Sequence, residues 1–568
     1  MVFQGLYLMH IIDWLVVGGY LTYVVWGSVR KSDATDTIKG YFLANRSLPW
    51  WAVGISVMAT QMSAITLVGT TGQAFDDGMR FIQFYLGLPL AMVILCLTVV
   101  PFFYRAKVYT AYEYLENRFD SRTRTLASML FLVSRGLSCG IIIAAPAVIL
   151  SVVLGWDLSL TVLVIGVPTV IYTMLGGIQA VTWADVKQMI IILIGITAVI
   201  MVIVSQFPPG VSISGAMRLA AASGRLTTLD FSFDFESTYT FWSGLLGGTF
   251  LMLSYFGCDQ SQVQRYLTAR SLSESRISLL MSAFLKIPLQ FVILLLGVLV
   301  FVFYNFSAPP ILFNQAQFEE AKTQPRFGQL VLAHKKASEN VQYTSQQFLL
   351  EESEISKDAY LSALRERQEI RSRAIQIVQV SEDASSFSDV NYVFPFFVVN
   401  NLPIGMVGLI VAAIFAAAMS SVSSELNALS TTTVMDFYRR LFRPDEEEKH
   451  YLLFSKVVTG IWGLAACAVA VYASQLGSLI EVVNRLGSFF YGSLLGVFIL
   501  AIGTRWATPL SASIGLIGGM IAVAGVSLLT EISFLWYNLV GVSAVILVAF
   551  LISWWEGAFK AGPGVGCD

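Results

Sequence analysis

Long apolar runs separated by short polar segments dominate this chain of 568 residues. An α-helix needs about 20 mostly apolar residues to cross the hydrocarbon core of a bilayer. The runs predict an all-α polytopic membrane protein with about thirteen transmembrane helices. These helices are expected at residues 7–28, 48–73, 81–104, 124–154, 158–176, 182–206, 239–258, 276–304, 396–435, 452–474, 478–503, 509–529 and 533–555.

The composition agrees with a membrane protein and gives no sign of an enzyme. The chain is 56% hydrophobic and 13% charged, with a mean hydropathy of +0.70, values that ordinary soluble domains do not reach. The five cysteines have no paired spacing that would indicate disulfides or zinc, and the three histidines are scattered. No HExxH or GxSxG motif occurs. With a net charge of −2, nothing points to a nucleic-acid partner.

Basic residues follow the first, third, seventh, ninth, eleventh and last spans and are nearly missing from the short loops opposite. The positive-inside rule therefore predicts an amino terminus outside and a carboxyl terminus in the cytoplasm of the plasma membrane, which is the inner membrane in a bacterium. The tail after Trp555 is too short for an attached signalling domain, which argues against a sensor. The basic residues are Arg30, Lys31, Lys39, Arg46, Arg105, Lys107, Arg118, Arg122, Arg124, Arg265, Arg270, Arg439, Arg440, Arg443, Arg505 and Lys560.

One long segment between the eighth and ninth spans breaks the apolar pattern. Residues 305–395 are polar and mixed in charge, and the topology places them outside the cytoplasm. Their charges are those of a solvated surface, without a spacing that indicates catalysis. We expect a helical external insertion that acts as a cap or spacer over the membrane core.

A row of hydroxyl groups lies on one side of the ninth span. Ala417, Ser420, Ser421 and Ser424 are spaced i, i+3, i+4 and i+7, so they share one helix face. Hard cations such as Na⁺ prefer oxygen ligands. In membrane helices, however, serines also bond their own i−4 carbonyl or allow close helix packing. The face is interpreted as part of a sodium site, with these two structural roles as the alternatives.

The centre of the second span is rich in small and polar residues from Ala59 to Thr66. Transporter helices are often interrupted at such places, because unwound backbone is tolerated at membrane depth where it lines a cavity. The carbonyls of Ala59 and Met62 would complete a cation site with Ser420 and Ser421. The alternative is an unbroken helix that packs through its small residues.

Asp185 lies just inside the membrane, where an ionisable group is costly unless it is paired or binds an ion. Lys187 faces another side of the helix, so a local ion pair is not expected. Asp185 is predicted to bind a second cation with Ser420, Ser423 and Ser424. Proton coupling is the nearest rival to sodium, although hydroxyl groups do not exchange protons near neutral pH and Asp185 alone would have to carry them.

Two cations, Arg135 and Lys286, lie deep within the fourth and eighth spans. Arginine suits carboxylate recognition, so an anionic part of a substrate is expected between them. The alternatives are that Arg135 pairs with an acid such as Glu425 or extends toward water, and that Lys286 extends to the cytoplasm. Polar and aromatic residues that would shape the same pocket are Gln61, Ser63, Thr66, Phe81, Tyr85 and Tyr255.

Six distinctive stretches occur in order along the chain. They are YFLANRSLPWW (41–51), YTAYEYLENRFDSRTR (109–124), YTMLGGIQAVTWADVKQ (172–188), YFGCDQSQVQRYLTAR (255–270), AAAMSSVSSELNALSTTTVMDFY (416–438) and LGSFFYGSLLGVF (486–498). With these stretches the chain resembles the sodium:solute symporter family, which includes sodium/glucose, proline, sialic acid, monocarboxylate and iodide cotransporters. The resemblance implies a LeuT-type core of two inverted five-helix repeats, residues 48–206 and residues 207–304 with 396–503. Residues 1–47 and 504–568 would be additional, and 305–395 lie outside the resemblance.

The resemblance also implies sodium-coupled symport of a small organic solute by a functional monomer. By match to the family motif, Ala59, Met62, Ala417, Ser420 and Ser421 correspond to a common sodium site. Asp185, Ser420, Ser423 and Ser424 correspond to a second site found in some members, which favours two Na⁺ per cycle. Tyr255 falls at an inner-gate position, and Gln61, Ser63, Thr66, Phe81 and Tyr85 fall at substrate-contacting positions.

Departures from the sugar transporters guide the choice of solute. Tyr85 replaces their glutamate in the third span and Met252 replaces an asparagine near the gate, although Lys286 matches their pocket lysine. Phe81, Arg135 and the SAIT run at residues 63–66 resemble the sialic acid members. The first expectation is therefore a carboxylate-bearing solute, similar to sialic acid or a monocarboxylate. The second is a neutral sugar or polyol.

Overall fold

The computed structural model describes residues 9–30, 36–381, 388–473 and 479–557, and these residues are mostly helical. Within these ranges the β-structure consists of one isolated bridge, between Leu48 and Ala269. The predicted all-α fold class is confirmed.

The helices of the first half of the chain are α1 (Ile11–Val29), α2 (Ile38–Leu43), η1 (Ala44–Arg46), α3 (Trp50–Thr60), α4 (Ala64–Asp77), η2 (Gly78–Tyr85), α5 (Gly87–Leu97), α6 (Val99–Ala106), α7 (Ala111–Arg118), α8 (Ser121–Leu154), α9 (Leu158–Ser205), α10 (Ile213–Ala222), η3 (Ser243–Gly247), α11 (Gly248–Gly257), α12 (Gln260–Tyr266) and α13 (Leu272–Phe306). Those of the second half are α14 (Gln315–Ala321), α15 (Pro325–Glu351), α16 (Glu354–Ser381), η4 (Val390–Tyr392), α17 (Val393–Asn401), α18 (Met406–Thr432), η5 (Thr433–Phe442), α19 (Glu448–Ala473), α20 (Leu479–Gly503), α21 (Pro509–Leu529), η6 (Phe534–Trp536) and α22 (Tyr537–Trp555).

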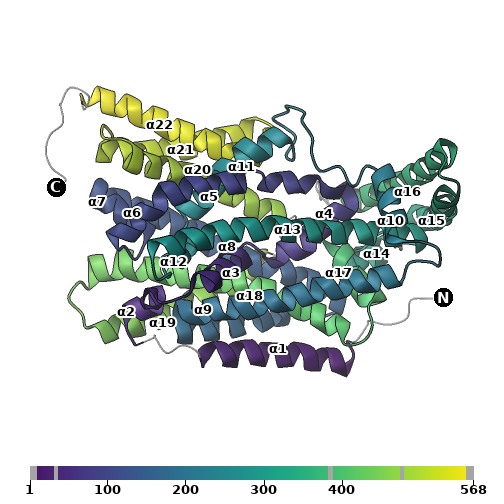
Figure 1. The fold of residues 1–568 in the computed structure, drawn as a ribbon, viewed down its shortest axis with the longest axis horizontal. Coiled ribbons are helices and arrows are strands. Elements are labelled where there is room, and N and C mark those ends of the chain that lie inside the picture. Colours follow the sequence, from purple (N-terminus) through teal and green to yellow (C-terminus); the bar gives the residue numbers. More distant parts are fainter. Residues whose placement is uncertain (1–8, 31–35, 382–387, 474–478, 558–568) are drawn as a thin grey trace.

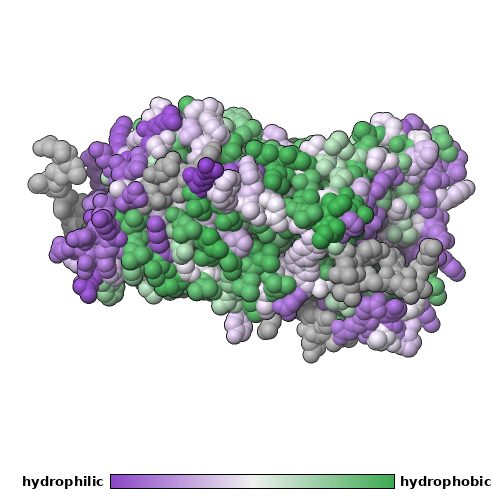
Figure 2. Space-filling model, turned by 90° about the horizontal axis from the view of Figure 1, so that it is seen from below, coloured by the Kyte–Doolittle hydropathy of each residue, from purple (hydrophilic) through white to green (hydrophobic). Residues whose placement is uncertain are grey.

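The long helices run side by side along the long axis of the molecule (Figure 1). On the face drawn in Figure 2, hydrophobic surface covers the middle of this bundle and hydrophilic surface covers both ends. Large apolar side chains of the long helices are exposed, among them Ile194, Phe284 and Leu464. A bundle with an apolar outer surface between two polar ends is the arrangement that a bilayer requires.

All thirteen predicted spans coincide with helical segments, although not every span is one continuous helix. Within the described ranges, nine helices are long and apolar enough to cross a membrane. These helices are fewer than the predicted spans because α9 covers two predicted spans, and because other predicted spans are interrupted or form shorter helices. In α9 the chain departs from helical geometry at Gly177, where φ is +54°. A Cβ at Gly177 would lie 2.4 Å from the carbonyl oxygen of Tyr41, so this bend needs glycine.

Helix α18 lies at the centre of the bundle and is buried along nearly all of its length. Asp13 of α1 holds its first turn, because its carboxylate accepts the N–H groups of Gly405 and Gly408 at 2.8 and 2.7 Å. A carboxylate at a helix amino terminus satisfies free N–H groups and complements the helix dipole. Gly408 permits this contact, since a Cβ there would lie 2.5 Å from the Asp13 carbonyl oxygen.

Residues 305–395 are largely helical, as predicted. Helices α15 and α16 pack against each other, and together with α10 and α14 they lie at the opposite end of the bundle from α2, α7 and α12 (Figure 1). A small apolar core that includes Phe327, Ala374 and Val378 holds this insertion together. The insertion is joined to the bundle by Arg367 of α16, which donates to the Tyr304 carbonyl of α13 at 2.8 Å.

Candidate functional site

The first of two interrupted helices lies between α3 and α4. Helix α3 ends at Thr60 and α4 begins at Ala64, so residues 61–63 are not helical. Ser63 caps the start of α4 by accepting the N–H of Thr66 at 3.3 Å. The break predicted at the centre of the second span is therefore confirmed. Gln61 and Ser63 line a cavity, which is the setting in which unwound backbone is tolerated inside a membrane.

The second interruption lies between α11 and α12, where Asp259 caps α12. The Asp259 carboxylate accepts the backbone N–H of Ser261 at 2.8 Å and its hydroxyl at 2.6 Å. The assignment of Arg265 to a basic cytoplasmic loop was wrong, because α12 continues inside the protein and Arg265 is 1% exposed. Interrupted helices are typical of transporter binding sites.

The serines of α18 reach two different neighbouring helices. Ser420 Oγ donates to Oδ1 of Asp185 in α9 at 2.6 Å. Ser421 Oγ donates to the carbonyl of Thr60 at the end of α3 at 3.0 Å, and Ser424 Oγ lies 3.1 Å from the Thr60 hydroxyl. The hydroxyl face predicted from the sequence thus faces both the α3–α4 break and Asp185.

Some of these hydroxyls also bond within α18, which was the alternative to ion binding. Ser423 and Ser424 donate to the carbonyl of Ser420 at 3.0 and 2.6 Å. Ser421 has a longer contact of 3.4 Å to the carbonyl of Ala417. A hydroxyl that donates its proton keeps two lone pairs, so these bonds are compatible with binding a cation.

Asp185 is fully buried, and its two oxygens have different partners. Oδ1 faces α18 and accepts from Ser420. Oδ2 accepts from Ser56 of α3 and from Arg265 of α12, each at 2.6 Å. The sequence correctly indicated that Lys187 is not its partner, because that side chain reaches Ser28 of α1. One side of the carboxylate is therefore ion-paired while the other side faces the serines.

A cavity of about 190 Å³ lies beside the two helix breaks and α18. Seven of the eight residues predicted to contact a solute line it, namely Gln61, Ser63, Thr66, Phe81, Tyr85, Arg135 and Tyr255. The exception is Lys286, whose Nζ donates to the Gln61 carbonyl at 3.3 Å and lies 5.2 Å from the Tyr85 ring centre. Lys286 is fully buried, so the alternative that it extends to the cytoplasm is wrong.

Arg135 is held by two acids at the cavity wall. Its Nε lies 2.5 Å from Asp259 Oδ2, and its NH1 lies 2.5 Å from Glu425 Oε1. Its NH2 donates to the hydroxyl of Tyr491, which in turn donates to Asp259 at 3.1 Å. The alternative in which Arg135 pairs with Glu425 is the arrangement that the structure shows. A direct role of Arg135 in solute binding stays a prediction.

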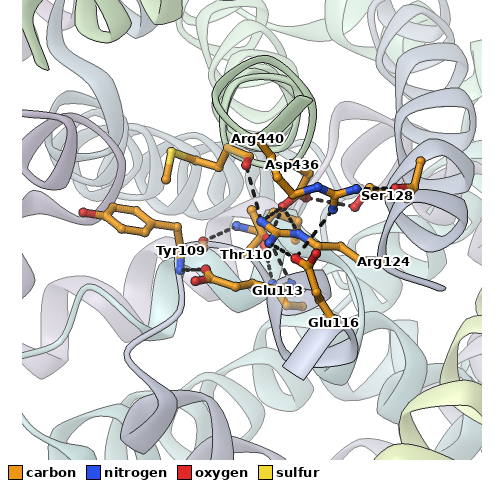
Figure 3. Close-up of polar contacts among 12 residues, drawn as sticks. Tyr109, Thr110, Glu113, Glu116, Arg124, Ser128, Asp436 and Arg440 are labelled. Carbon is orange, nitrogen blue, oxygen red and sulfur yellow. Dashed lines mark hydrogen bonds and ion pairs between the residues drawn. The ribbon is translucent and has the colours of Figure 1, made fainter. Parts of the chain in front are cut away.

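A second buried charge network lies away from the cavity, where η5 meets α7 and α8 (Figure 3). The Asp436 carboxylate accepts from Thr110 Oγ1 at 2.8 Å, from Ser128 Oγ at 2.9 Å and from Arg124 Nε at 2.9 Å. Arg124 also pairs with Glu116 at 2.6 Å. Arg124, expected in a basic loop, is 7% exposed and ties the ends of three helices together.

The sequence of most of the chain matches that of a known transporter family. Residues 41–323 and 374–519 match the Sodium:solute symporter family. The chain belongs to this family. The predicted resemblance is thereby confirmed, and the LeuT-type fold follows from it. Residues 324–373, on α15 and α16, are unmatched. The expectation that all of 305–395 lies outside the resemblance was wrong, because residues 305–323 and 374–395 are matched.

Individual members of the sodium:solute symporter family align over nearly the whole chain. The chain is 27% identical to the sodium/sialic acid symporter SiaT of Proteus mirabilis (strain HI4320), over 94% of this chain and 93% of that protein. It is 28% identical to the sodium-dependent multivitamin transporter of Oryctolagus cuniculus, over 89% of this chain and 67% of that protein. A solved structure of a Na⁺-coupled sialic acid symporter, in a substrate-bound outward-open state, has a TM-score of 0.74 at 25% identity, covering 95% and 97% of the two chains.

Several side chains of this symporter's site were missed in the sequence. Asp259 followed by Gln262 is a helix amino-terminal signal, which would have revealed α12 and the buried position of Arg265. Tyr491 carried no distinguishing signal, because it lies in an apolar run. Ser56 and Thr60 were passed over as small polar residues of the second span.

Proposed function

We propose that this symporter imports a small carboxylate-bearing solute, similar to sialic acid or a monocarboxylate, together with two Na⁺. The observation that carries this proposal is the meeting of oxygen atoms from three helices. Ser421 Oγ lies 3.0 Å from the Thr60 carbonyl, and Ser420 Oγ lies 2.6 Å from Asp185. Oxygens from α3, α9 and α18 thus surround a region that is shielded from water.

The first Na⁺ is assigned to Ala59, Met62, Ala417, Ser420 and Ser421. Ala59 is in the last turn of α3, at the negative end of the helix dipole, and its carbonyl accepts the N–H of Met62 at 2.9 Å while keeping a second lone pair for a cation. The contact between Ser421 and Thr60 supports this assignment, because it brings α18 against that turn. A cation at this position would be bound partly by backbone carbonyl groups. Such ligands distinguish between ions by size more than by charge.

The second Na⁺ is assigned to Asp185, Ser420, Ser423 and Ser424. Asp185 Oδ1 is directed toward the serines, whereas Oδ2 is occupied by Arg265 and Ser56. A cation can therefore approach Oδ1 without breaking the ion pair. Because Arg265 balances the negative charge of Asp185, we expect this site to bind Na⁺ more weakly than an unpaired carboxylate would.

The solute is assigned to the 190 Å³ cavity, in contact with Gln61, Ser63, Thr66, Phe81, Tyr85, Arg135 and Tyr255, with Lys286 behind its wall. Relatives that transport sialic acid and monocarboxylates favour a carboxylate-bearing solute. A neutral sugar or polyol is the second candidate. It is favoured by the pairing of Arg135 with two acids, which already compensate the charge of the guanidinium.

We place the amino terminus outside and the carboxyl terminus in the cytoplasm of the plasma membrane, in a bacterium the inner membrane. The wide separation of α2, α7 and α12 from the insertion supports this orientation (Figure 1). The inverted repeats are assigned to residues 48–206 and to 207–304 with 396–503, and the working unit to a monomer. The insertion at 305–395 is assigned as an external cap.

Uptake into proteoliposomes tests this function. Import of sialic acid and of a panel of monocarboxylates, sugars and polyols is compared with an inward Na⁺ gradient, a K⁺ gradient and a proton gradient. We expect accumulation with Na⁺ alone, and a strong rise in the Na⁺ concentration required in Ser421→Ala and Asp185→Asn. Exposed Ser232→Ala and Asp234→Asn are the matched controls. Uptake that follows the proton gradient, or unchanged Na⁺ dependence in both site variants, would contradict the proposal.

A further inference from the structure

The charges around Arg135 do not balance. Arg135, Glu425 and Asp259 are 5%, 3% and 2% exposed, so one positive group is buried with two carboxylates. Buried charges are costly unless they are compensated. In its ionised form, this group of three has one negative charge more than it has positive charges. A positive group from elsewhere would complete it.

The hydrogen-bond partners of the carboxylate oxygens show which oxygen is left without a partner. Asp259 uses both oxygens, because Oδ1 accepts from Ser261 and Oδ2 from Arg135 and Tyr491. Glu425 Oε1 is held by Arg135, but Glu425 Oε2 is buried and has no hydrogen-bond partner within the described residues. Glu425 also lines the cavity. A buried acceptor without a partner costs free energy, and here it lies where a solute would bind.

We propose that the transported solute carries a protonated amine in addition to its carboxylate, and that Glu425 Oε2 accepts an N–H of that amine. The inference rests on the proposed function and specifies the substrate class of the same cavity. An ammonium group beside Glu425 brings the buried charges to balance and gives Oε2 its missing partner. The aromatic ring of Phe81 on the cavity wall adds a favourable surface for a cation, whereas the rings of Tyr255 and Tyr491 already lie against Arg135.

The same geometry places the solute carboxylate away from Arg135. The guanidinium already donates to Asp259, Glu425 and Tyr491, and a third carboxylate there would be repelled by the first two. The opposite side of the cavity is formed by Ser63 and Thr66 at the start of α4. Helix amino termini attract anions, and Lys286 lies beneath the Gln61 carbonyl close to this end. A zwitterion therefore fits both ends of the cavity.

Matched solute pairs that differ in the amine test this assignment. The purified full chain in Na⁺ is titrated with L-proline against cyclopentanecarboxylate, γ-aminobutyrate against butyrate, and N-acetylneuraminate as an anion without an amine. Binding is followed by calorimetry in the wild type, in Glu425→Gln and in Glu446→Gln, a half-buried carboxylate control outside the cavity that pairs with Arg443. Because a charge-assisted hydrogen bond is stronger than a neutral one, we expect an amine-bearing member to bind at least about tenfold more tightly than its partner.

In Glu425→Gln this preference should fall to about twofold or less, while Glu446→Gln should retain it. Equal or tighter binding of the amine-free acids by the wild type would overturn the inference, as would an unchanged amine preference in Glu425→Gln. Thermal stabilisation by Na⁺ without solute is measured in the same samples, with Ser421→Ala as the comparison. Loss of the amine preference with intact Na⁺ stabilisation refutes this inference alone, whereas loss of Na⁺ stabilisation in the wild type refutes the proposed function.

Discussion

Arg265 donates to Asp185 through NH1 and Oδ2, 2.6 Å apart, and both side chains are almost completely buried. The pair joins α12, the inner part of an interrupted helix, to α9. Arg265 Nε and NH2 have no hydrogen-bond partner within the described residues. Arg265 thus depends on Asp185, and Ser56 beside it, for its compensation. Asp185 therefore pairs with the Arg265 side chain and would also bind the proposed second Na⁺.

Removal of Arg265 should make the protein more dependent on Na⁺. In Arg265→Gln the buried carboxylate of Asp185 loses its counter-charge, which in buried pairs destabilises by about 3–5 kcal/mol. Na⁺ at the serine side would replace part of that charge. We expect a lower Tm than the wild type in K⁺ and a larger rise of Tm on adding Na⁺. Thermal unfolding of the detergent-solubilised protein over a Na⁺ titration measures both effects.

Two controls distinguish a change in the Na⁺ response from a general loss of stability. Arg270→Gln removes an exposed arginine near α12, which donates to the Ser47 carbonyl, and should leave the Na⁺ response unchanged. The double variant Asp185→Asn with Arg265→Gln removes both buried charges and should be more stable in K⁺ than Arg265→Gln alone. A Na⁺ response in Arg265→Gln no larger than in the wild type would show that Na⁺ does not compensate Asp185.

The Asp436 network should stabilise the protein without affecting solute or ion affinity. Asp436→Asn removes the charge that compensates buried Arg124 while keeping similar volume, and leaves Glu116 as its acidic partner. We expect a loss of about 2–4 kcal/mol in the free energy of unfolding, with Na⁺ affinity changed less than twofold. Denaturant unfolding and Na⁺ binding on the same preparation measure both. A marked loss of Na⁺ affinity with unchanged stability would contradict this separation.

The insertion at residues 305–395 should lose stability in mild acid because of His334. Burial, with Arg367 and Arg371 nearby, lowers the pKa of His334 from 6.5 to about 3. A base whose pKa is lower in the folded state stabilises that state fully above pH 6.5 and loses this contribution as the pH falls toward 3. At pH 5 the loss amounts to about 2 kcal/mol.

Hydrogen exchange on the full chain checks the effect of pH on the insertion. Protection factors of peptides from α15 and α16 are compared at pH 7 and pH 5, with peptides from α21 and α22 as an internal control. We expect α15 and α16 to lose protection relative to the control, and His334→Gln to abolish most of the difference. Equal protection of the insertion at both pH values would contradict the assigned pKa of His334.

The sequence predicted those features of the fold and site that depend on local pattern. Run length located the membrane helices, and the small polar centre of the second span located the break before Ala64. The i, i+3, i+4, i+7 spacing of Ala417, Ser420, Ser421 and Ser424 indicated that they share one helix face. Each signal comes from residues within a few turns of one another, where helix geometry fixes relative position.

Pairings between residues that lie far apart in the sequence could not be predicted from local patterns. Arg135 meets Asp259 across 124 positions in the chain and Glu425 across 290. The segment around Arg265 resembled a cytoplasmic loop in the sequence, because α12 is short and polar. In the structure Arg265 is buried. Which acid neutralises which base is decided by how helices pack, so the sequence showed the candidates and left their partners open.

Direct counting of bound Na⁺ tests the central claim most directly. Equilibrium binding of radioactive ²²Na⁺ to the purified protein is measured in the wild type, Ser421→Ala, Asp185→Asn and the double variant, with Ser232→Ala as control. We predict two sites in the wild type and in the control, one in each single variant and none in the double variant. Two retained sites in both single variants, at unchanged affinity, would contradict the account.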